Sequence, residues 1–222
     1  MDDTLRFILS LSISIAVIIG IVRFRRIDPA YYPFIFVCIA ALVIEIMNRI
    51  LMENGLPKVF VFLLNVFSYI DFFFFLLLFH NWGLFNRKKI TFITIASTFF
   101  VIWIVTNIIF TGFIKVNRYF FILYSFALIF FSVNTFNKMI VHERKSIFRS
   151  PKFWVCLGLI IFYSFWIVLV ATSLSVFVDD LSIEFKSRLW SINVYSNLLV
   201  NLLYAVAVIC IPKKKSFTSL LW

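Results

Sequence analysis

The stretch VFVFLLNVFSYIDFFFFLLLFH, residues Val59–His80, decides the fold class of this chain. It is almost entirely apolar and about as long as the roughly 20 residues that a helix needs to cross a bilayer. Its apolar residues run on continuously and do not alternate with polar ones, which argues against a strand of a membrane barrel. Because only helices and closed barrels satisfy their backbone hydrogen bonds within lipid, we expect a transmembrane helix here.

Six further apolar stretches of similar length fill the rest of the chain almost end to end. A content of 63% hydrophobic and 14% charged residues excludes a soluble protein. The sequence therefore predicts an all-α integral membrane protein, a single domain over residues 1–222 that folds as a seven-transmembrane-helix bundle. The gaps between the stretches are too short for a folded extramembrane domain. The expected spans are Leu5–Val22, Ala30–Met52, Val59–His80, Thr91–Phe113, Tyr119–Ile140, Phe153–Val178 and Leu189–Pro212.

Basic residues gather in alternate gaps between these spans, which gives the bundle a predicted direction. Loops rich in Lys and Arg stay in the cytoplasm, so we expect the N-terminus outside and the C-terminus in the cytoplasm, in the inner membrane of a bacterium. The other gaps hold few basic residues. The expected cytoplasmic side holds most of the 21 basic residues: Arg23, Arg25, Arg26, Arg87, Lys88, Lys89, Lys138, Arg144, Lys145, Arg149, Lys152, Lys213, Lys214 and Lys215.

This distribution also explains the net charge of +11. The positive side chains lie where topology and anionic lipid headgroups require them, so membrane lipids are the expected partners and no direct nucleic-acid partner is predicted. The cysteines Cys38, Cys156 and Cys210 lie within apolar spans and form no C-x-x-C pair, so neither a disulfide framework nor a zinc site is expected. The first span has the reverse charge order of a signal peptide, and we expect it to be retained as a helix.

Charged residues inside the spans are the first candidates for a functional site, because each costs at least about 2.5–3.5 kcal/mol at the bilayer centre on insertion scales. Glu45 and Arg49 are four residues apart on the second span with the acid first, the favourable order for an ion pair within one helix. Such a pair would neutralise itself, with Arg49 reaching the outer surface. Asp71 lies near the middle of the third span with no basic residue within one turn. A structural and a functional role for Asp71 both stay open.

Polar residues on the second, third and seventh spans lie at matching depths, between the outer surface and the middle of the membrane. Their spacing puts those of the third span on one face and those of the seventh in one stripe, with Ser68 and Asn193 beside them. We expect the three helices to meet around a polar pocket open to the outside. The alternative is that these side chains are hydrogen-bond partners between helices, worth roughly 0.6–2 kcal/mol each. The predicted pocket residues are Glu45, Asn48, Arg49, Asn65, Asp71, Asn197, Asn201 and Tyr204.

Other chemistry finds little support in the sequence. His142-Glu143-Arg144 lacks the second histidine of a zinc-protease motif, and there is no Gly-x-Ser-x-Gly or phosphate-binding loop. The seventh span has no lysine to anchor a retinal Schiff base. We therefore predict no catalytic residue, no metal and no cofactor, and rank an intramembrane enzyme last. The five glycines are few for a transporter built on broken helices.

Three stretches carry a resemblance to a known family: Phe60–Phe85 (FVFLLNVFSYIDFFFFLLLFHNWGLF), Phe153–Ser164 (FWVCLGLIIFYS) and Leu189–Cys210 (LWSINVYSNLLVNLLYAVAVIC). Together they resemble a poorly characterised group of small bacterial seven-helix membrane proteins, related to sensor-like membrane modules that precede histidine kinases. The residues that carry the resemblance include Asn65, Asp71, Trp154, Trp190 and Asn197. The resemblance implies a sensor-like membrane module and brings no catalytic assignment.

We expect a non-enzymatic sensor or accessory protein that binds a ligand or partner in the outward-facing pocket. It would relay the signal through its basic loops and the tail Lys213–Trp222 to a cytoplasmic or membrane protein partner. A regulator or effector in a multi-gene system such as phage defence belongs to the same class. The oligomeric state stays open, and a homo-oligomer is one alternative. The alternative is a small transporter or channel that uses Asp71 as a proton- or cation-coupling group.

Overall fold

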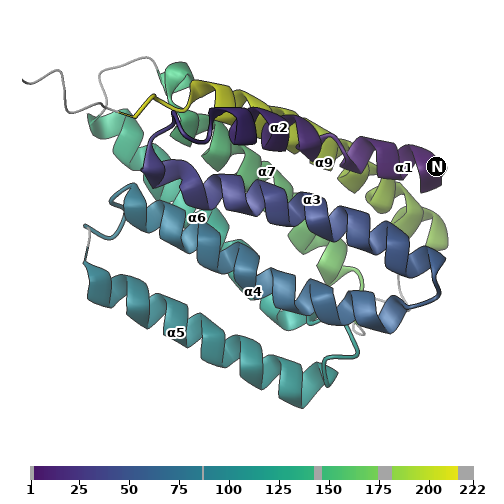
Figure 1. The fold of residues 1–222 in the computed structure, drawn as a ribbon. Helices are drawn as coiled ribbons and strands as arrows, with labels where there is room; N and C mark the ends of the chain where they lie inside the picture. The colour runs from purple at the N-terminus through teal and green to yellow at the C-terminus, as the bar shows by residue number, and fades with distance from the viewer. Residues whose placement is uncertain (1–2, 87, 143–146, 175–181, 215–222) are drawn as a thin grey trace, which may run out of the picture.

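The chain folds as a bundle of long helices. The structure, a computed structural model, describes residues 3–86, 88–142, 147–174 and 182–214. Within these residues it is helical apart from connections and one isolated backbone bridge, and seven helical spans are long and apolar enough to cross a membrane. The predicted fold class is therefore confirmed. The spans lie side by side, with α5 at one edge (Figure 1). Which way the bundle crosses the membrane stays a prediction.

The helical elements follow the predicted spans closely. Two of them, η1 and η3, are single 3₁₀ turns, and η2 is a short π-helix that continues α5. In chain order the elements are α1 (Asp3–Ser10), α2 (Ile13–Arg23), η1 (Pro29–Tyr31), α3 (Tyr32–Glu53), α4 (Pro57–Asn81), α5 (Lys89–Thr106), η2 (Asn107–Thr111), α6 (Arg118–His142), η3 (Ile147–Arg149), α7 (Pro151–Ala171) and α9 (Ile183–Cys210).

Proline and glycine set several of these boundaries. Pro29, Pro57 and Pro151 each stand in the first turn of a helical element, where the missing N–H is not needed. Gly112 follows η2 with a φ of 56°, a left-handed conformation that glycine adopts without strain and that stops the helix.

Three predicted spans need correction. The first is not one helix, because α1 stops at Ser10 and α2 starts at Ile13. The sixth was expected to run to Val178, but α7 ends at Ala171, and residues 175–178 of that prediction lie outside the described residues. The end of α7 has a local cause, since the hydroxyls of the next two residues bond back to carbonyls of its last turn at 2.8 and 2.6 Å. The seventh starts earlier than predicted, at Ile183.

The core is aromatic and is formed where α3, α4, α6, α7 and α9 meet. Phe34, Phe72, Phe75 and Phe79 are fully or almost fully buried. The edge helix α5 packs on this core through stacked rings, with Phe99 and Phe72 centroids 4.2 Å apart. Many large apolar side chains point outwards instead, as a lipid-facing surface requires.

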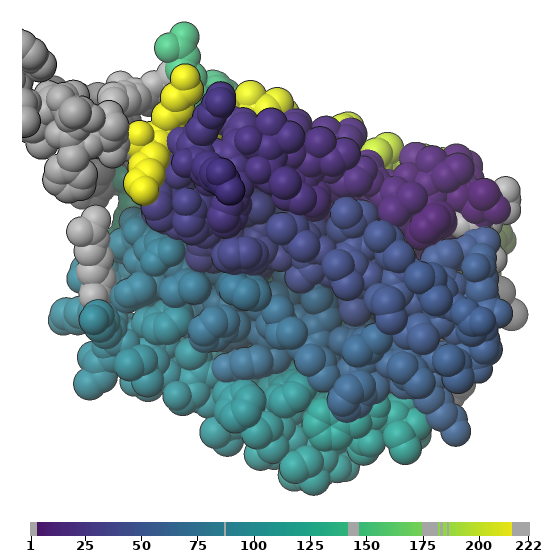
Figure 2. Space-filling view, viewed as in Figure 1, coloured from purple at the N-terminus to yellow at the C-terminus, as the bar shows by residue number. Residues whose placement is uncertain are grey.

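The first and last spans are joined at one end of the bundle. The Arg23 guanidinium donates to the carbonyls of Val208 and Ile209, both at 2.6 Å, and to Ile211 at 3.0 Å. It therefore caps the end of α9, whose last carbonyls have no partner within the helix. Beyond it, Ile27 and Lys213 form an antiparallel bridge. Figure 2 shows the yellow C-terminal residues against this purple N-terminal segment.

We call this end the basic end. Within the described residues, the connections that reach it include Arg25, Arg26, Lys88, Lys213 and Lys214. Arg87, Arg144, Lys145 and Lys215 of the predicted set lie outside the described residues. The N-terminus of α1 lies at the opposite end of the bundle (Figure 1).

Candidate functional site

The contacts that the structure shows for the predicted pocket residues do not link all of them to one another. Five of them fall into three polar clusters, each built from a different combination of helices. We name these the interruption cluster, which holds Glu45 and Asn201, the core cluster, which holds Asp71 and Tyr204, and the Asn65 cluster. The clusters differ in burial and in hydrogen bonding, and therefore in what each can do.

The interruption cluster forms where the first span breaks. In a continuous helix the Ser10 carbonyl would accept from the amide of Ser14. Here the Ser14 amide bonds to the Leu11 carbonyl at 2.9 Å instead. The hydroxyls of Ser10 and Ser12 bond back to carbonyls of α1 at 2.9 and 2.6 Å. Such local side-chain bonds compete with the helical ladder, which explains the break.

Asn201 on α9 meets the groups that the break exposes. Its Nδ2 donates to the Ser10 carbonyl at 3.4 Å and to the Ser12 hydroxyl at 2.9 Å. Asn201 is 4% exposed, so these bonds lie away from water. A backbone carbonyl released inside a membrane needs a partner, and Asn201 supplies it from the neighbouring helix.

Glu45 on α3 reaches the same cluster from another side. Its half-buried carboxylate interacts with the Ser10 side chain and with the positive charge of Arg6. The Arg6 guanidinium in turn lies over the Trp190 ring of α9, 4.7 Å from the ring centroid. Polar and charged groups of α1, α3 and α9 thus converge at the break.

The expected ion pair between Glu45 and Arg49 does not form. Arg49 pairs with Glu53, four residues further along α3, and its guanidinium lies over the Phe7 ring at 5.6 Å from the centroid. The four-residue spacing allows both pairs and the acid-first order favours Glu45, but the position of α1 decides for Glu53 because Phe7 and Ser10 draw the Glu45 and Arg49 side chains apart. Glu45 is therefore left to the interruption cluster.

Two other predicted pocket residues, on α3 and α9, make no side-chain hydrogen bond within the described residues. These residues, Asn48 and Asn197, are both half-buried. On the same stripe of α9, Asn193 is 8% exposed, and its Oδ1 has no partner among the described residues. A buried amide oxygen without a donor is unusual, so this part of α9 has unused hydrogen-bonding capacity.

The core cluster surrounds Asp71 at the centre of the bundle. Asp71 on α4 is 5% exposed, and the Tyr163 hydroxyl of α7 donates to its Oδ2. The ring of Tyr124 on α6 stands edge-on to the Tyr163 ring, with centroids 5.5 Å apart. Tyr124 and Tyr204 both lie within electrostatic range of the carboxylate. A single acidic group thus faces phenols from three helices.

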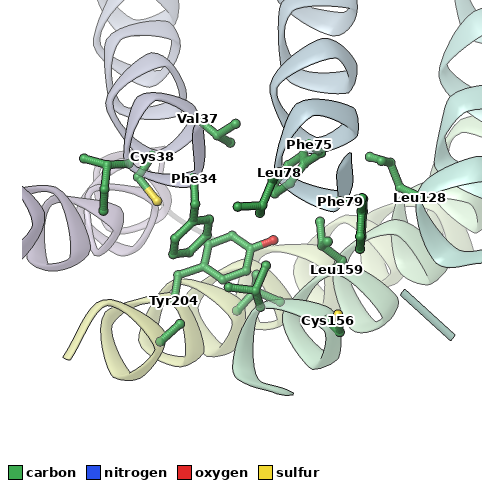
Figure 3. Close-up of a cluster of buried hydrophobic side chains, with 14 of the residues drawn as sticks. Phe34, Val37, Cys38, Phe75, Leu78, Phe79, Leu128, Cys156, Leu159 and Tyr204 are labelled. Carbon is green, nitrogen blue, oxygen red and sulfur yellow. The ribbon is translucent and has the colours of Figure 1, made fainter. Parts of the chain in front are cut away.

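Tyr204 reaches this position because Gly158 leaves room for it. A Cβ on Gly158 would stand 2.5 Å from Cε1 of the Tyr204 ring, closer than real atoms approach. On its other side the ring meets Phe34 edge-on, with centroids 5.2 Å apart. Figure 3 shows the Tyr204 ring extending from α9 into the buried cluster beside Phe34. The glycine therefore sets how closely α7 and α9 approach.

The Asn65 cluster has a structural character. The Asn65 side chain donates to the Lys115 carbonyl and accepts from the Asn117 amide, both at 3.0 Å. Its backbone carbonyl accepts from the Trp103 indole at 2.8 Å. Asn65 is fully buried, and the first two bonds hold the connection before α6 against α4, whereas the third holds α5 against α4. The geometry of Asn65 therefore fits the alternative interpretation, in which the polar side chain is a hydrogen-bond partner between elements of the bundle.

Several of these contacts could not be predicted from the sequence pattern. Tyr163 and Tyr124 lie in apolar stretches and looked like ordinary aromatic residues, because nothing in their spacing marks a partner on another helix. The pair Ser10 and Ser12 carried the only signal for the break, since serines favour bonds that compete with a helix. Within the described residues, no group of three His, Cys, Asp or Glu side chains comes together.

Comparison with known proteins adds no family to this description. No protein-family model, no curated protein and no solved structure matches the chain. The helix lengths and hydropathy show a multi-pass membrane protein with seven spans, and its function has to be inferred from the clusters.

Proposed function

We propose that this protein is a non-enzymatic sensor or accessory protein of a bacterial inner membrane. It binds a ligand or a partner at the interruption cluster and passes the change to a cytoplasmic partner through the segment after α9. The observation that carries the proposal is the contact of Asn201 with the interrupted first span, at the Ser10 carbonyl and the Ser12 hydroxyl.

The binding step follows from how this contact is made. The Asn201 amide and the groups at the break satisfy one another, and Glu45 with Arg6 adds one charge of each sign. A small polar ligand that offers its own donors and acceptors can replace the contact of Asn201. A ligand shifts a conformational equilibrium only by the difference between its affinities for the two states. The exchange of the Asn201 contact for contacts with the ligand would supply that difference in affinity.

The relay step follows from the second junction between the same two spans. The first span and α9 are joined at the break through Asn201 and again at the basic end through Arg23. The bridge between Ile27 and Lys213 then holds the start of the C-terminal segment. A shift of α9 against the first span therefore reaches Lys213, and residues 215–222 of the proposed output tail lie outside the described residues.

A spin label at Lys214 tests the relay in the full-length protein in lipid nanodiscs. The label is attached to K214C in a C210S background, because the other two cysteines are buried. We expect Asn201→Leu to raise the label's mobility, since the junction at the break is lost. Ser12→Ala should give a smaller change. The control is Ser125→Ala, because this buried hydroxyl bonds only to the Phe121 carbonyl in its own helix.

An unchanged label spectrum in Asn201→Leu, with the protein still folded, would refute the relay. An equal change in Ser125→Ala would show a general loosening of the bundle and would also refute it.

A proton- or cation-coupled transporter is the second candidate, and the core cluster is the observation in its favour. Asp71 is an acidic group near the middle of its span, held by one phenol, and such groups often mark proton or ion pathways. Asp71→Asn keeps the volume and an acceptor for Tyr163. In proteoliposomes with a pH-sensitive dye, transport predicts a proton flux that the wild type shows and Asp71→Asn lacks. Flux no greater than in protein-free liposomes would reject proton coupling.

A further inference from the structure

A groove opens at the basic end, away from all three clusters. It has a volume of about 440 Å³ and lies between the connection after α4 and the last turns of α6. Its walls combine two kinds of side chain. The apolar part includes Phe85, Phe130 and Phe131, and the polar part includes Asn134, Asn137 and Lys138.

The two parts are ordered along the helix axis. From Phe130 to Lys138 the helix rises about 12 Å, at roughly 1.5 Å per residue. On α6, Phe130 and Phe131 therefore lie deeper in the membrane, and the amides and the ammonium lie nearer its surface, with Val141 about one turn further on. Phe130 is 63% exposed, so its ring faces the lipid or an occupant of the groove. This order, polar at the surface and apolar below, is the order of a phospholipid.

The charge at the mouth of the groove is fixed in place. The Lys138 ammonium donates to the Leu84 carbonyl at 2.8 Å, which holds it across the groove. Lys88 on the same connection and Lys89 at the start of α5 are both exposed. Basic clusters at a membrane surface attract anionic lipids. Asn134 and Asn137 bring amide donors that suit phosphate and ester oxygens.

We propose that this groove binds one anionic phospholipid. Its phosphate lies at Asn137 and Lys138, and one acyl chain follows Phe130 and Phe131 towards the middle of the membrane. The site is independent of the proposed sensor function, because it shares no residue with the interruption cluster.

Native mass spectrometry of the purified full-length protein tests this site. The protein is released from detergent micelles that contain phosphatidylglycerol or phosphatidylcholine at equal concentration. We expect the wild type to retain phosphatidylglycerol in preference to phosphatidylcholine. Lys138→Gln should reduce that retention about tenfold, because a charge-assisted hydrogen bond is lost. The matched control is Lys88→Gln, which removes the same charge from the same end but outside the groove. It should reduce retention much less than Lys138→Gln, because an exposed charge outside the groove attracts the lipid only at long range.

Two further variants keep the test independent of the Leu84 contact. Asn134→Leu leaves Lys138 in place and should also reduce retention. Phe130→Ala should weaken binding of long-chain lipid more than of a six-carbon analogue. Equal retention of both headgroups, or equal loss in Lys138→Gln and Lys88→Gln, would overturn the proposal. Displacement by inorganic phosphate at the lipid concentration would show a simple anion site and would overturn it too.

Discussion

Replacing Tyr163 with phenylalanine tests whether its hydrogen bond to Asp71 stabilises the centre of the bundle. Tyr163 is 2% exposed and Asp71 is 5% exposed, so water has little access to replace the lost donor. The change removes one oxygen and keeps the ring. A buried acceptor left without its partner costs about 1–3 kcal/mol. At about 2–4 °C per kcal/mol for a chain of this size, we expect Tm to fall by about 2–12 °C.

The assay is thermal unfolding in detergent, followed by tryptophan fluorescence. The matched control is Tyr69→Phe, the same substitution at a less buried tyrosine. The Tyr69 hydroxyl donates to the Ala96 carbonyl at 3.2 Å. That carbonyl lies inside α5 and already accepts within its own helix. Losing the second bond leaves no buried group unsatisfied, so this control should cost less than about 1 kcal/mol.

The double variant Asp71→Leu with Tyr163→Phe completes the test. Replacing both partners by apolar groups of similar shape can be nearly neutral, so we expect the double variant to melt above Tyr163→Phe alone. A Tm for Tyr163→Phe equal to that of the wild type would refute the reasoning. So would a double variant whose loss is the sum of the two single losses, because the two groups would then act independently.

Two further predictions concern the junctions of α9. Arg23→Gln should speed backbone hydrogen exchange at the end of α9 about fivefold or more, which corresponds to the loss of about 1 kcal/mol or more. The control Arg25→Gln, at an exposed arginine, should leave the exchange rate unchanged. Equal exchange rates in both variants would contradict the capping role of Arg23. Gly158→Ala should lower stability by about 1–3 kcal/mol through overpacking against Tyr204. In Gly20→Ala, the new Cβ would stand 3.0 Å from Cδ1 and 3.2 Å from Cγ2 of Ile35, further than the 2.5 Å to the Tyr204 ring at Gly158. Denaturant unfolding should therefore find a smaller loss of stability for Gly20→Ala than for Gly158→Ala.

The sequence was enough to predict the spans but not how they pack. Hydropathy over about 20 residues is a property of each segment alone, so the span Val59–His80 could be recognised without its neighbours. The helix α4 starts two residues before this predicted span and ends one residue after it. The place of Asp71 near the middle of that span was equally readable from the sequence. Its partner Tyr163 was not, because the spacing of one helix does not say which residue of another helix lies opposite.

The Glu45 prediction shows the same limit at a single residue. Two ion pairs obey the four-residue spacing, Glu45 with Arg49 and Arg49 with Glu53. The energy of such a pair on one helix is a few tenths of a kcal/mol, so a contact from another helix easily decides which forms. The Phe7 ring of α1 lies under Arg49, and Arg49 pairs with Glu53. A prediction from one helix cannot include that contact.

The two acidic residues inside the bundle differ in access, and access separates their roles. Asp71 is enclosed by rings from α6, α7 and α9, so a ligand could reach it only after helices move apart. Glu45 is half-buried and lies beside an interrupted helix, where backbone groups already take their partners from another span. Exchange of partners at the break moves fewer packed side chains than opening the core would. For the proposed function, we therefore expect a ligand to enter at the Glu45 side, and we expect Asp71 to respond to a change in helix packing and not to contact the ligand.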